Sequence, residues 1–297
     1  MKKIVFIVFV CFLFVSNAQD LFVGSYNIRC VMHSDKKCGD IWEVRGEKLC
    51  QQILFLEPDV FGTQEASDKQ LKQMDEWLRE YAHVGVGRDD GKKKGEHSAI
   101  FYNKTKYKLL DKGNFWLNSQ PDKPIVGWDA SKVRICSWAK LKDKVNGFEF
   151  YFFNLHLDHR GEQSKQKSAF LVVEKIKEIA NNEPFILTGD FNSEDTSISY
   201  KIFKESGLMF DSYITAEDKF SENGTYMAFD PERKSQRRID YIFVSKHFNV
   251  RKYAVLTDTY WTENKDKKTK EQRPYIQRTF SDHYPIFAKL RYSDNKR

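Results

Sequence analysis

Several polar side chains of this sequence come directly after short hydrophobic runs, where a β-strand would end. They are Asn27, Glu65, His156, Asp190 and Asn192. Carboxylate and amide oxygens bind hard divalent cations, and an imidazole exchanges protons near neutral pH. Each residue alone also has an ordinary structural explanation, such as a turn former, a helix-terminal charge or a buried histidine. Their repeated position after successive runs predicts a reactive site.

Asp190 and Asn192 form the most informative pair, in the string Gly189-Asp190-Phe191-Asn192. While the chain stays extended, the alternation of side chains points both residues to one face. The carboxylate can orient or deprotonate a water molecule, and the amide can donate a hydrogen bond to a phosphate oxygen. The alternative for so short a string is an ordinary turn.

A carboxylate and an imidazole are also available toward the C-terminus. Asp240 lies inside one hydrophobic run, and Asp282 and His283 immediately precede another. An aspartate held against an imidazole fixes the tautomer of the ring and stabilises its protonated form. We therefore expect Asp240 to pair with His283, and the alternative is a capped turn.

Strand-length runs alternate with stretches of helical periodicity. The expected strands are residues 21–28, 60–64, 97–103, 107–116, 134–142, 148–155, 185–188, 238–244, 253–257 and 284–290. Apolar residues at three- and four-residue spacing predict helices over residues 44–56, 69–81 and 163–180. Some strands are apolar on both faces, which indicates that they are sandwiched between layers. The pattern predicts an α/β fold.

Taken in order, these motifs resemble those of the endonuclease/exonuclease/phosphatase superfamily, which includes pancreatic-type deoxyribonucleases and deadenylases. The matching motifs are Tyr26-Asn27-Ile28, Gln64-Glu65, Gly95-Glu96, Arg134, Asn154-Leu155-His156, Gly189-Asp190-Phe191-Asn192, Ile239-Asp240-Tyr241 and Ser281-Asp282-His283. The resemblance implies a four-layer α/β/β/α sandwich. In it, two mostly antiparallel, mixed β-sheets pack face to face and the helices lie on the outside.

The resemblance also implies roles for individual residues. Asn27 and Glu65 would hold Mg²⁺ or Mn²⁺, with Asp282 contributing directly or through water, and oxygen ligands suit these ions. The number of metal ions stays open.

The implied catalytic group has two further parts. Asp190 would activate the attacking water, Asn192 and His156 would contact the scissile phosphate, and Asp240 would orient His283. Glu96 would support His156 as a second carboxylate–imidazole pair, and Arg134 would bind a phosphate oxygen of the substrate.

The resemblance implies a divalent-metal-dependent phosphoesterase that acts on a phosphate ester by in-line attack of water. We expect a phosphodiesterase or nuclease first, and basic residues before Asp240, including Arg237 and Arg238, are candidates for contacting nucleic acid. A solvated loop is the alternative for these basic residues. A phosphomonoesterase for small sugar, inositol or lipid phosphates is the second hypothesis, and a catalytically silent binding protein on the same fold is the third.

The N-terminus predicts export. The first residues have the layout of a signal peptide: two lysines, then an apolar run over residues 4–15, then Ser16-Asn17-Ala18. Residues 1–18 would therefore be removed. The run is too short to span a bilayer comfortably. We expect a secreted or periplasmic monomer, formed by one domain over residues 19–297, without stable membrane insertion. A formal net charge of +7 permits a polyanionic substrate. Cys30 and Cys38 could pair, and free thiols are the alternative.

Overall fold

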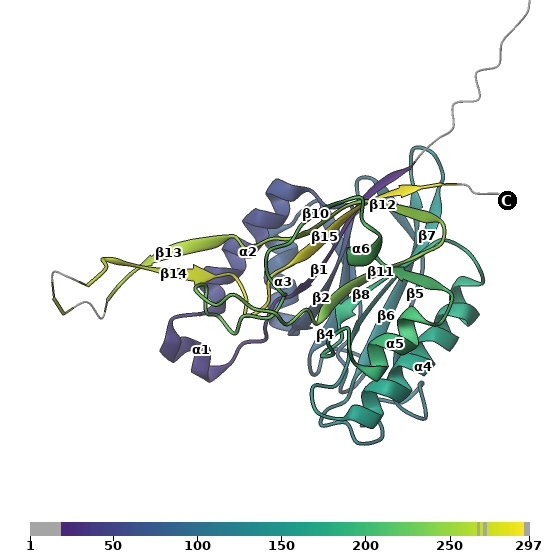
Figure 1. The fold of residues 1–297 in the computed structure, drawn as a ribbon, viewed down its shortest axis with the longest axis horizontal. Helices are drawn as coiled ribbons and strands as arrows, with labels where there is room; N and C mark the ends of the chain where they lie inside the picture. The colour runs from purple at the N-terminus through teal and green to yellow at the C-terminus, as the bar shows by residue number, and fades with distance from the viewer. Residues whose placement is uncertain (1–18, 266–267, 270–271, 294–297) are drawn as a thin grey trace, which may run out of the picture.

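The computed structural model describes residues 19–265, 268–269 and 272–293, so the expected signal peptide lies outside the described residues. Two β-sheets pack face to face, and helices cover their outer faces (Figure 1). This arrangement confirms the expected four-layer α/β/β/α sandwich. Within the described part of the chain, no helix is both long and apolar enough to cross a membrane.

The first sheet has seven strands in the order β10-β12-β15-β1-β2-β4-β3. Their bounds are Asp218–Phe220, Phe248–Val255, Ile286–Tyr292, Asp20–Asn27, Val60–Ala66, His97–Asn103 and Tyr81–Val84, in that order. The β1–β2 and β10–β12 pairs are parallel and the others are antiparallel, so the sheet is mixed as expected.

The second sheet has six strands in the order β5-β6-β7-β8-β11-β9. Their bounds are Tyr107–Trp116, Ile135–Asp143, Glu149–His156, Phe185–Asp190, Asp240–Ser245 and Met209–Asp211. Only the β7–β8 pair is parallel. The short strands β3, β9 and β10 were not expected, because three or four residues are too few to show a period-two alternation.

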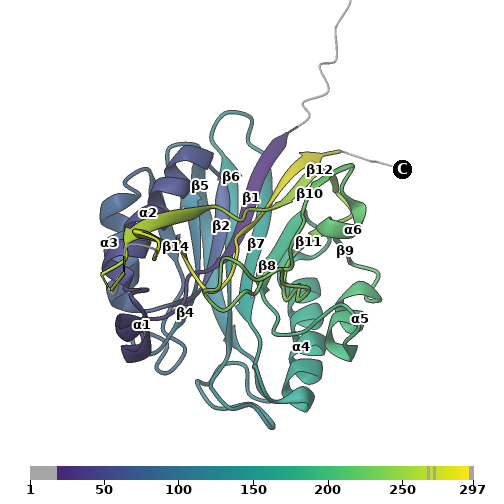
Figure 2. The same cartoon turned by 60° about the vertical axis from the view of Figure 1, so that its left-hand side comes forward.

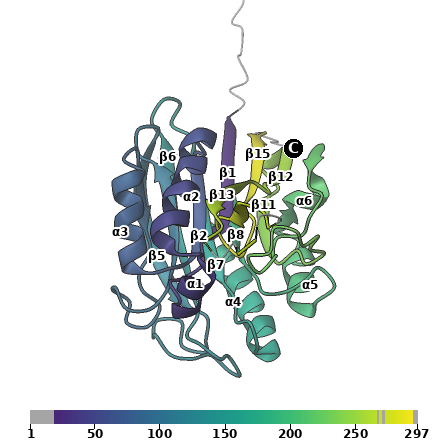
Figure 3. The ribbon, with the colours of Figure 1, turned by 90° about the vertical axis from the view of Figure 1, so that its left-hand side faces the viewer.

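Three apolar layers hold the sandwich together. One lies between the sheets and includes Phe152 and Ile242. A second packs under α2 (Trp42–Leu56) and α3 (Asp68–Trp77), and a third under α4 (Glu162–Ala180) and α5 (Ile198–Lys204). Figures 2 and 3 show these helix pairs on opposite sides of the strands.

A two-stranded hairpin projects from the body of the molecule (Figure 1). It consists of β13 (Thr259–Glu263) and β14 (Tyr275–Thr279), neither of which is among the strands expected from the sequence. The base of the hairpin is fixed because Arg278 lies 2.8 Å from Asp40 and the rings of Tyr260 and Phe280 stack. These long-range contacts stabilise strands whose own sequence has no clear alternation.

The remaining helices are short, and they complete the connections. They are α1 (His33–Cys38) and α6 (Ser212–Thr215). Cys30 precedes α1 and Cys38 is its last residue, and both are free thiols in this structure, as are Cys50 and Cys136. Of the two alternatives for Cys30 and Cys38, this structure has the free thiols and not the pair.

Candidate active site

Strand direction and register bring the expected polar residues to one end of the molecule. β7 and β8 are parallel and β11 runs antiparallel to β8, so the ends of β7 and β8 lie beside the start of β11. The register pairs Asp190 with His156 on one side and with Asp240 on the other. Three side chains from separate segments thus form one row across the end of this sheet.

Asn27 and Glu65 reach the same row from the other sheet. Nδ2 of Asn27 donates to Oδ2 of Asp190 at 2.9 Å and to Oε1 of Glu65 at 3.2 Å. The register of β2 against β4 shifts between Thr63 and Ala66. An irregularity of this kind re-aims a side chain relative to the regular alternation, and Glu65 lies within it.

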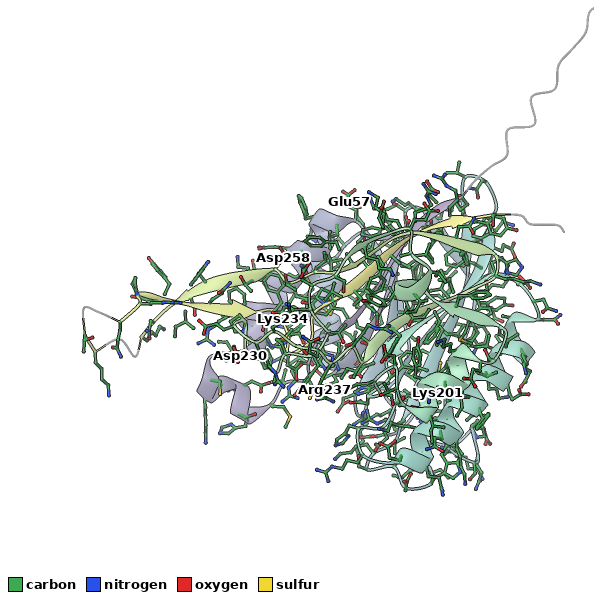
Figure 4. The ribbon with its side chains drawn as sticks, viewed as in Figure 1. Glu57, Lys201, Asp230, Lys234, Arg237 and Asp258 are labelled. Atoms are coloured by element: carbon green, nitrogen blue, oxygen red, sulfur yellow. The ribbon has the colours of Figure 1, made fainter. Side chains whose placement is uncertain are left out.

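A cavity of about 540 Å³ opens over this row. Its other lining residues include Arg29, Arg88, Lys132, His159 and Tyr226. Arg237 lines it from the loop before β11, and in the view of Figure 4 it lies between α1 and α5. Cavities of about 300–1,000 Å³ are typical of small-molecule sites, and the basic lining favours an anion.

Asp240 and His283 form the expected dyad. Nδ1 of His283 lies 2.8 Å from Oδ2 of Asp240, and both side chains are buried. Burial alone would lower the pKa of His283, but Asp240 and Asp190 raise it well above its usual value. The ring of Tyr226 packs edge-on against the imidazole, with the centroids 5.0 Å apart. The two carboxylates therefore favour the protonated form of His283.

Asn192 binds His156 through its amide nitrogen. This nitrogen lies 3.1 Å from the carbonyl oxygen of Leu157 and 3.0 Å from Nε2 of His156. Because a carbonyl oxygen only accepts, Leu157 fixes the orientation of the amide, and Nε2 of His156 must then be an unprotonated acceptor. Burial lowers the pKa of His156 and Arg134 lowers it further, which agrees with a neutral ring. Both amide hydrogens of Asn192 are already used, so its expected contact with a phosphate is not prepared in this rotamer.

The expected pairing of Glu96 with His156 is wrong. Oε2 of Glu96 lies 2.6 Å from Nη1 of Arg88, and Oε1 lies 2.9 Å from Nη2. Nδ1 of His156 has no hydrogen-bond partner among the described residues. The carboxylate of Glu96 binds the guanidinium group of Arg88 because this group offers two charged donors in a planar fork.

Arg134 lies at the cavity, as expected, and only 3% of it is exposed. Its Nε lies 3.2 Å from Oδ2 of Asp158, and its Nη2 lies 3.1 Å from Nδ1 of His159. Its Nη1 is buried and unpartnered within the part of the chain that the structure describes. An anion in the cavity could satisfy this donor.

Comparison with known proteins agrees with this geometry. The sequence model described as "Endonuclease/Exonuclease/phosphatase family" matches residues 24–283. The chain belongs to this family.

Two solved structures from Bacteroides thetaiotaomicron are similar to nearly the whole of this family member. One, an endonuclease/exonuclease/phosphatase family protein, is 47% identical with a TM-score of 0.89, and the match covers 93% of this chain and 99% of that one. The other, a mannosyl-6-phosphatase, is 48% identical with a TM-score of 0.87, and the match covers 91% of this chain and 99% of that one. Human nocturnin is 26% identical over 255 residues, which are 79% of this chain and 55% of nocturnin. This chain thus spans about half the length of that curated relative.

Membership of this family and the donor set of the site make the chain a metal-dependent phosphoesterase. The carboxylates of Glu65 and Asp282 both line the cavity. Burial raises the pKa of Asp282 and Glu65 raises it further, although Arg29 lies 3.4 Å away. Two carboxylates gathered at a cavity wall fit a hard divalent cation, which prefers oxygen ligands.

The other potential metal ligands already take part in hydrogen bonds. Donor atoms of Asp190, Asp240 and His283 lie within 4.8 Å of one another, but the contact between Asp240 and His283 is already a hydrogen bond. The amide oxygen of Asn27 accepts the backbone N–H of Arg29 at 3.0 Å, while its nitrogen faces Glu65. Asn27 would have to rotate its amide to offer oxygen, and its role as a ligand stays a prediction.

Arg29 and Arg88 line the cavity although neither was expected there, and Arg238 lies away from it. Arg238 is buried and lies 2.8 Å from Asp211, so it does not contribute to a basic rim. A visible signal for Arg88 was its place in the glycine-rich loop before Glu96. Arg29 directly follows the Tyr26-Asn27-Ile28 motif, but its orientation depends on a left-handed backbone, with φ of 57°. Such strained residues cluster at functional sites and are not readable from residue type.

Proposed function

We propose that this enzyme hydrolyses phosphate monoesters, with phosphorylated sugars as substrates. The observation that carries the proposal is the 48% identity to a mannosyl-6-phosphatase, over 91% of this chain. It favours the monoesterase alternative over the nuclease or phosphodiesterase activity that the sequence placed first. The cavity of about 540 Å³ supports the proposal, because its volume lies in the range of small-molecule sites.

In this proposal Asp190 accepts the proton of the attacking water. Its carboxylate is oriented by Nδ2 of Asn27 at 2.9 Å and by the backbone N–H of Asn192 at 2.8 Å. Burial and the neighbouring Asp240 raise the pKa of Asp190. A base with a raised pKa is better matched to proton transfer near neutral pH.

His283 and Arg134 would carry the positive charge that offsets the negative charge of the phosphate. The protonated imidazole of His283, held by Asp240, would neutralise the phosphate or donate a proton to the leaving oxygen. Nη1 of Arg134 would bind a phosphate oxygen. A bound divalent cation, held by Glu65 and Asp282, would supply further neutralisation of negative charge.

The test compares monoesters with diesters. Purified protein is assayed for phosphate release from mannose 6-phosphate and for cleavage of bis-p-nitrophenyl phosphate and single-stranded DNA, each with Mg²⁺, Mn²⁺ or EDTA. We expect metal-dependent phosphate release, with kcat/KM at least about tenfold higher than for the diesters, which corresponds to about 1.4 kcal/mol. His283→Asn serves as the inactive control.

A preference for either diester would overturn the monoesterase proposal and restore the nuclease hypothesis. The monoester p-nitrophenyl phosphate is assayed alongside, and its hydrolysis without hydrolysis of mannose 6-phosphate would retain the reaction type and overturn the sugar substrate. Activity that persists in EDTA would contradict the role given to Glu65 and Asp282.

A further inference from the structure

The loop between β3 and β4 folds back on itself and presents Arg88 to the cavity. The backbone N–H of Arg88 donates to the carbonyl oxygen of Glu96 at 3.0 Å, and Nε1 of Trp116 donates to the carbonyl oxygen of Arg88 at 2.7 Å. Neighbouring bonds join Gly87 to Lys92 and Asp89 to Lys94. The position of Arg88 is therefore fixed by its own loop and by β5.

The side chain of Arg88 is also fixed by hydrogen bonds. Its two terminal nitrogens bind both oxygens of Glu96, and Arg88 is 8% exposed. Its Nε is buried without a hydrogen-bond partner among the described residues. Glu96 thus neutralises Arg88 in part but leaves one donor unused.

Arg134 contributes a second unused donor nearby. Its Nη1 is buried and unpartnered in the described part of the chain, and both arginines line the cavity together with His156. Burial lowers the pKa of Arg134, and the charge of Arg88 lowers it further, so the two guanidinium groups repel each other. Unpaired buried donors and close like charges are costly, and a bound anion relieves both costs.

The charge at this end of the cavity is positive. Arg88, Lys132 and Arg134 bring three positive charges, and their carboxylate partners Glu96 and Asp158 bring two negative charges. A third carboxylate, Asp89, lies 4.0 Å from Nε of Arg88, but its side chain is 39% exposed, so solvent screens its charge. A terminal phosphate has a second pKa of about 6 and is mostly a dianion above neutral pH. A diester has one negative charge and one fewer terminal oxygen. The excess charge and the free donors therefore favour the dianion.

We propose that Arg88, acting beside Arg134, selects substrates that carry a terminal, doubly charged phosphate, and that Glu96 is the positioning residue of Arg88. This inference rests on the proposed monoesterase function and deepens it, because it names the group that discriminates against diesters.

The experiment measures kcat/KM for p-nitrophenyl phosphate and bis-p-nitrophenyl phosphate in the wild type, Arg88→Gln and Arg88→Lys. The matched control is Lys93→Gln, which removes one positive charge from an exposed position of the same loop. We expect Arg88→Gln to lower the monoester value about 30- to 100-fold and the diester value less than about threefold, because charge-assisted hydrogen bonds are the strong ones. The monoester kcat/KM of Arg88→Lys should lie between the values of the wild type and Arg88→Gln. The value of the control Lys93→Gln should match that of the wild type.

Inorganic phosphate gives a second readout that does not depend on turnover. Its competitive inhibition constant should rise in Arg88→Gln by a similar factor to the monoester loss. Because Arg88→Gln leaves the half-buried Glu96 without its partner, the double variant Arg88→Gln/Glu96→Gln is measured as well, with the thermal midpoint of each protein. The double variant should regain stability but keep the loss of monoester preference.

Equal losses on both substrates in the folded variants, or an unchanged monoester-to-diester ratio, would overturn the inference. If the wild type itself prefers the diester, the proposed function fails first. If the wild type prefers the monoester and Arg88→Gln keeps that preference, only the role of Arg88 fails.

Discussion

Asn27 and Asp190 are 163 residues apart in the chain, and Nδ2 of Asn27 donates a hydrogen bond of 2.9 Å to Oδ2 of Asp190. The bond crosses from β1 of one sheet to β8 of the other. The proposed base is therefore oriented by the opposite sheet, so the packing of the two sheets determines the geometry of the site.

Replacing Asp190 by Asn should separate activity from stability. We expect kcat on p-nitrophenyl phosphate to fall by about 10²- to 10⁴-fold, because a neutral amide cannot accept the proton of water. The thermal midpoint in EDTA should not fall, because burial already disfavours the charged form of this carboxylate. A variant that loses its fold together with its activity would contradict this account.

Asp240→Asn tests the dyad. Asp240 holds Nδ1 of His283 at 2.8 Å and raises the pKa of the imidazole. An amide at this position would not stabilise the imidazolium, so we expect kcat to fall by about 10³- to 10⁴-fold. The pH profile provides the check. Activity in the variant should be lost at a lower pH on the alkaline side than in the wild type, because less alkali is needed to deprotonate His283. An unchanged profile would mean that His283 does not act as a cation.

The positions of the site residues could be predicted because they follow from strand order. Once β7, β8 and β11 are neighbours, the register alone places His156, Asp190 and Asp240 in one row. The partners of these residues could not be predicted. Glu96 binds Arg88 because the loop between them closes on itself, and that closure depends on long-range contacts such as the bond from Trp116.

The hairpin of β13 and β14 was missed for a similar reason. Its strands have no alternating pattern, and tertiary contacts of Arg278 with Asp40 fix its base. Amide orientation is equally invisible to sequence. The carbonyl group of Leu157 decides which atom Asn192 presents to His156.

Asp158 should contribute to stability in a pH-dependent way. Burial would raise its pKa, but the backbone N–H groups of Gly161 and Arg160 and the charge of Arg134 hold the pKa well below its usual range. A lowered pKa in the folded state stabilises the protein above the unfolded pKa of about 4, and this stability is lost as the pH falls through the folded value. Asp158→Asn should lower the free energy of unfolding by about 2 kcal/mol at pH 7. In urea denaturation at pH 3 the difference from the wild type should shrink, and an equal difference at both values would refute the electrostatic explanation.

Asn154 lies between the two sheets, and all of its hydrogen-bonding capacity is used. Its nitrogen donates to the carbonyl oxygens of Thr63 and Ala99, and its oxygen accepts from Gln64 and Thr188. Asn154→Leu has a similar volume but leaves these buried groups without their partner. Since each unsatisfied group costs about 1–3 kcal/mol, we expect the free energy of unfolding to fall by at least about 3 kcal/mol.

The same variant should also lower activity at temperatures where it remains folded. Thr63 begins the irregular part of β2 that carries Glu65, so a loss of the bond from Asn154 should shift Glu65 relative to Asp190. The control is Asn249→Leu, an exposed position on β12, which should change stability by less than about 0.5 kcal/mol. Chemical denaturation and kcat on p-nitrophenyl phosphate measure the two effects. If Asn154→Leu is as stable as the control, the bonds between the sheets do not determine the geometry of this site.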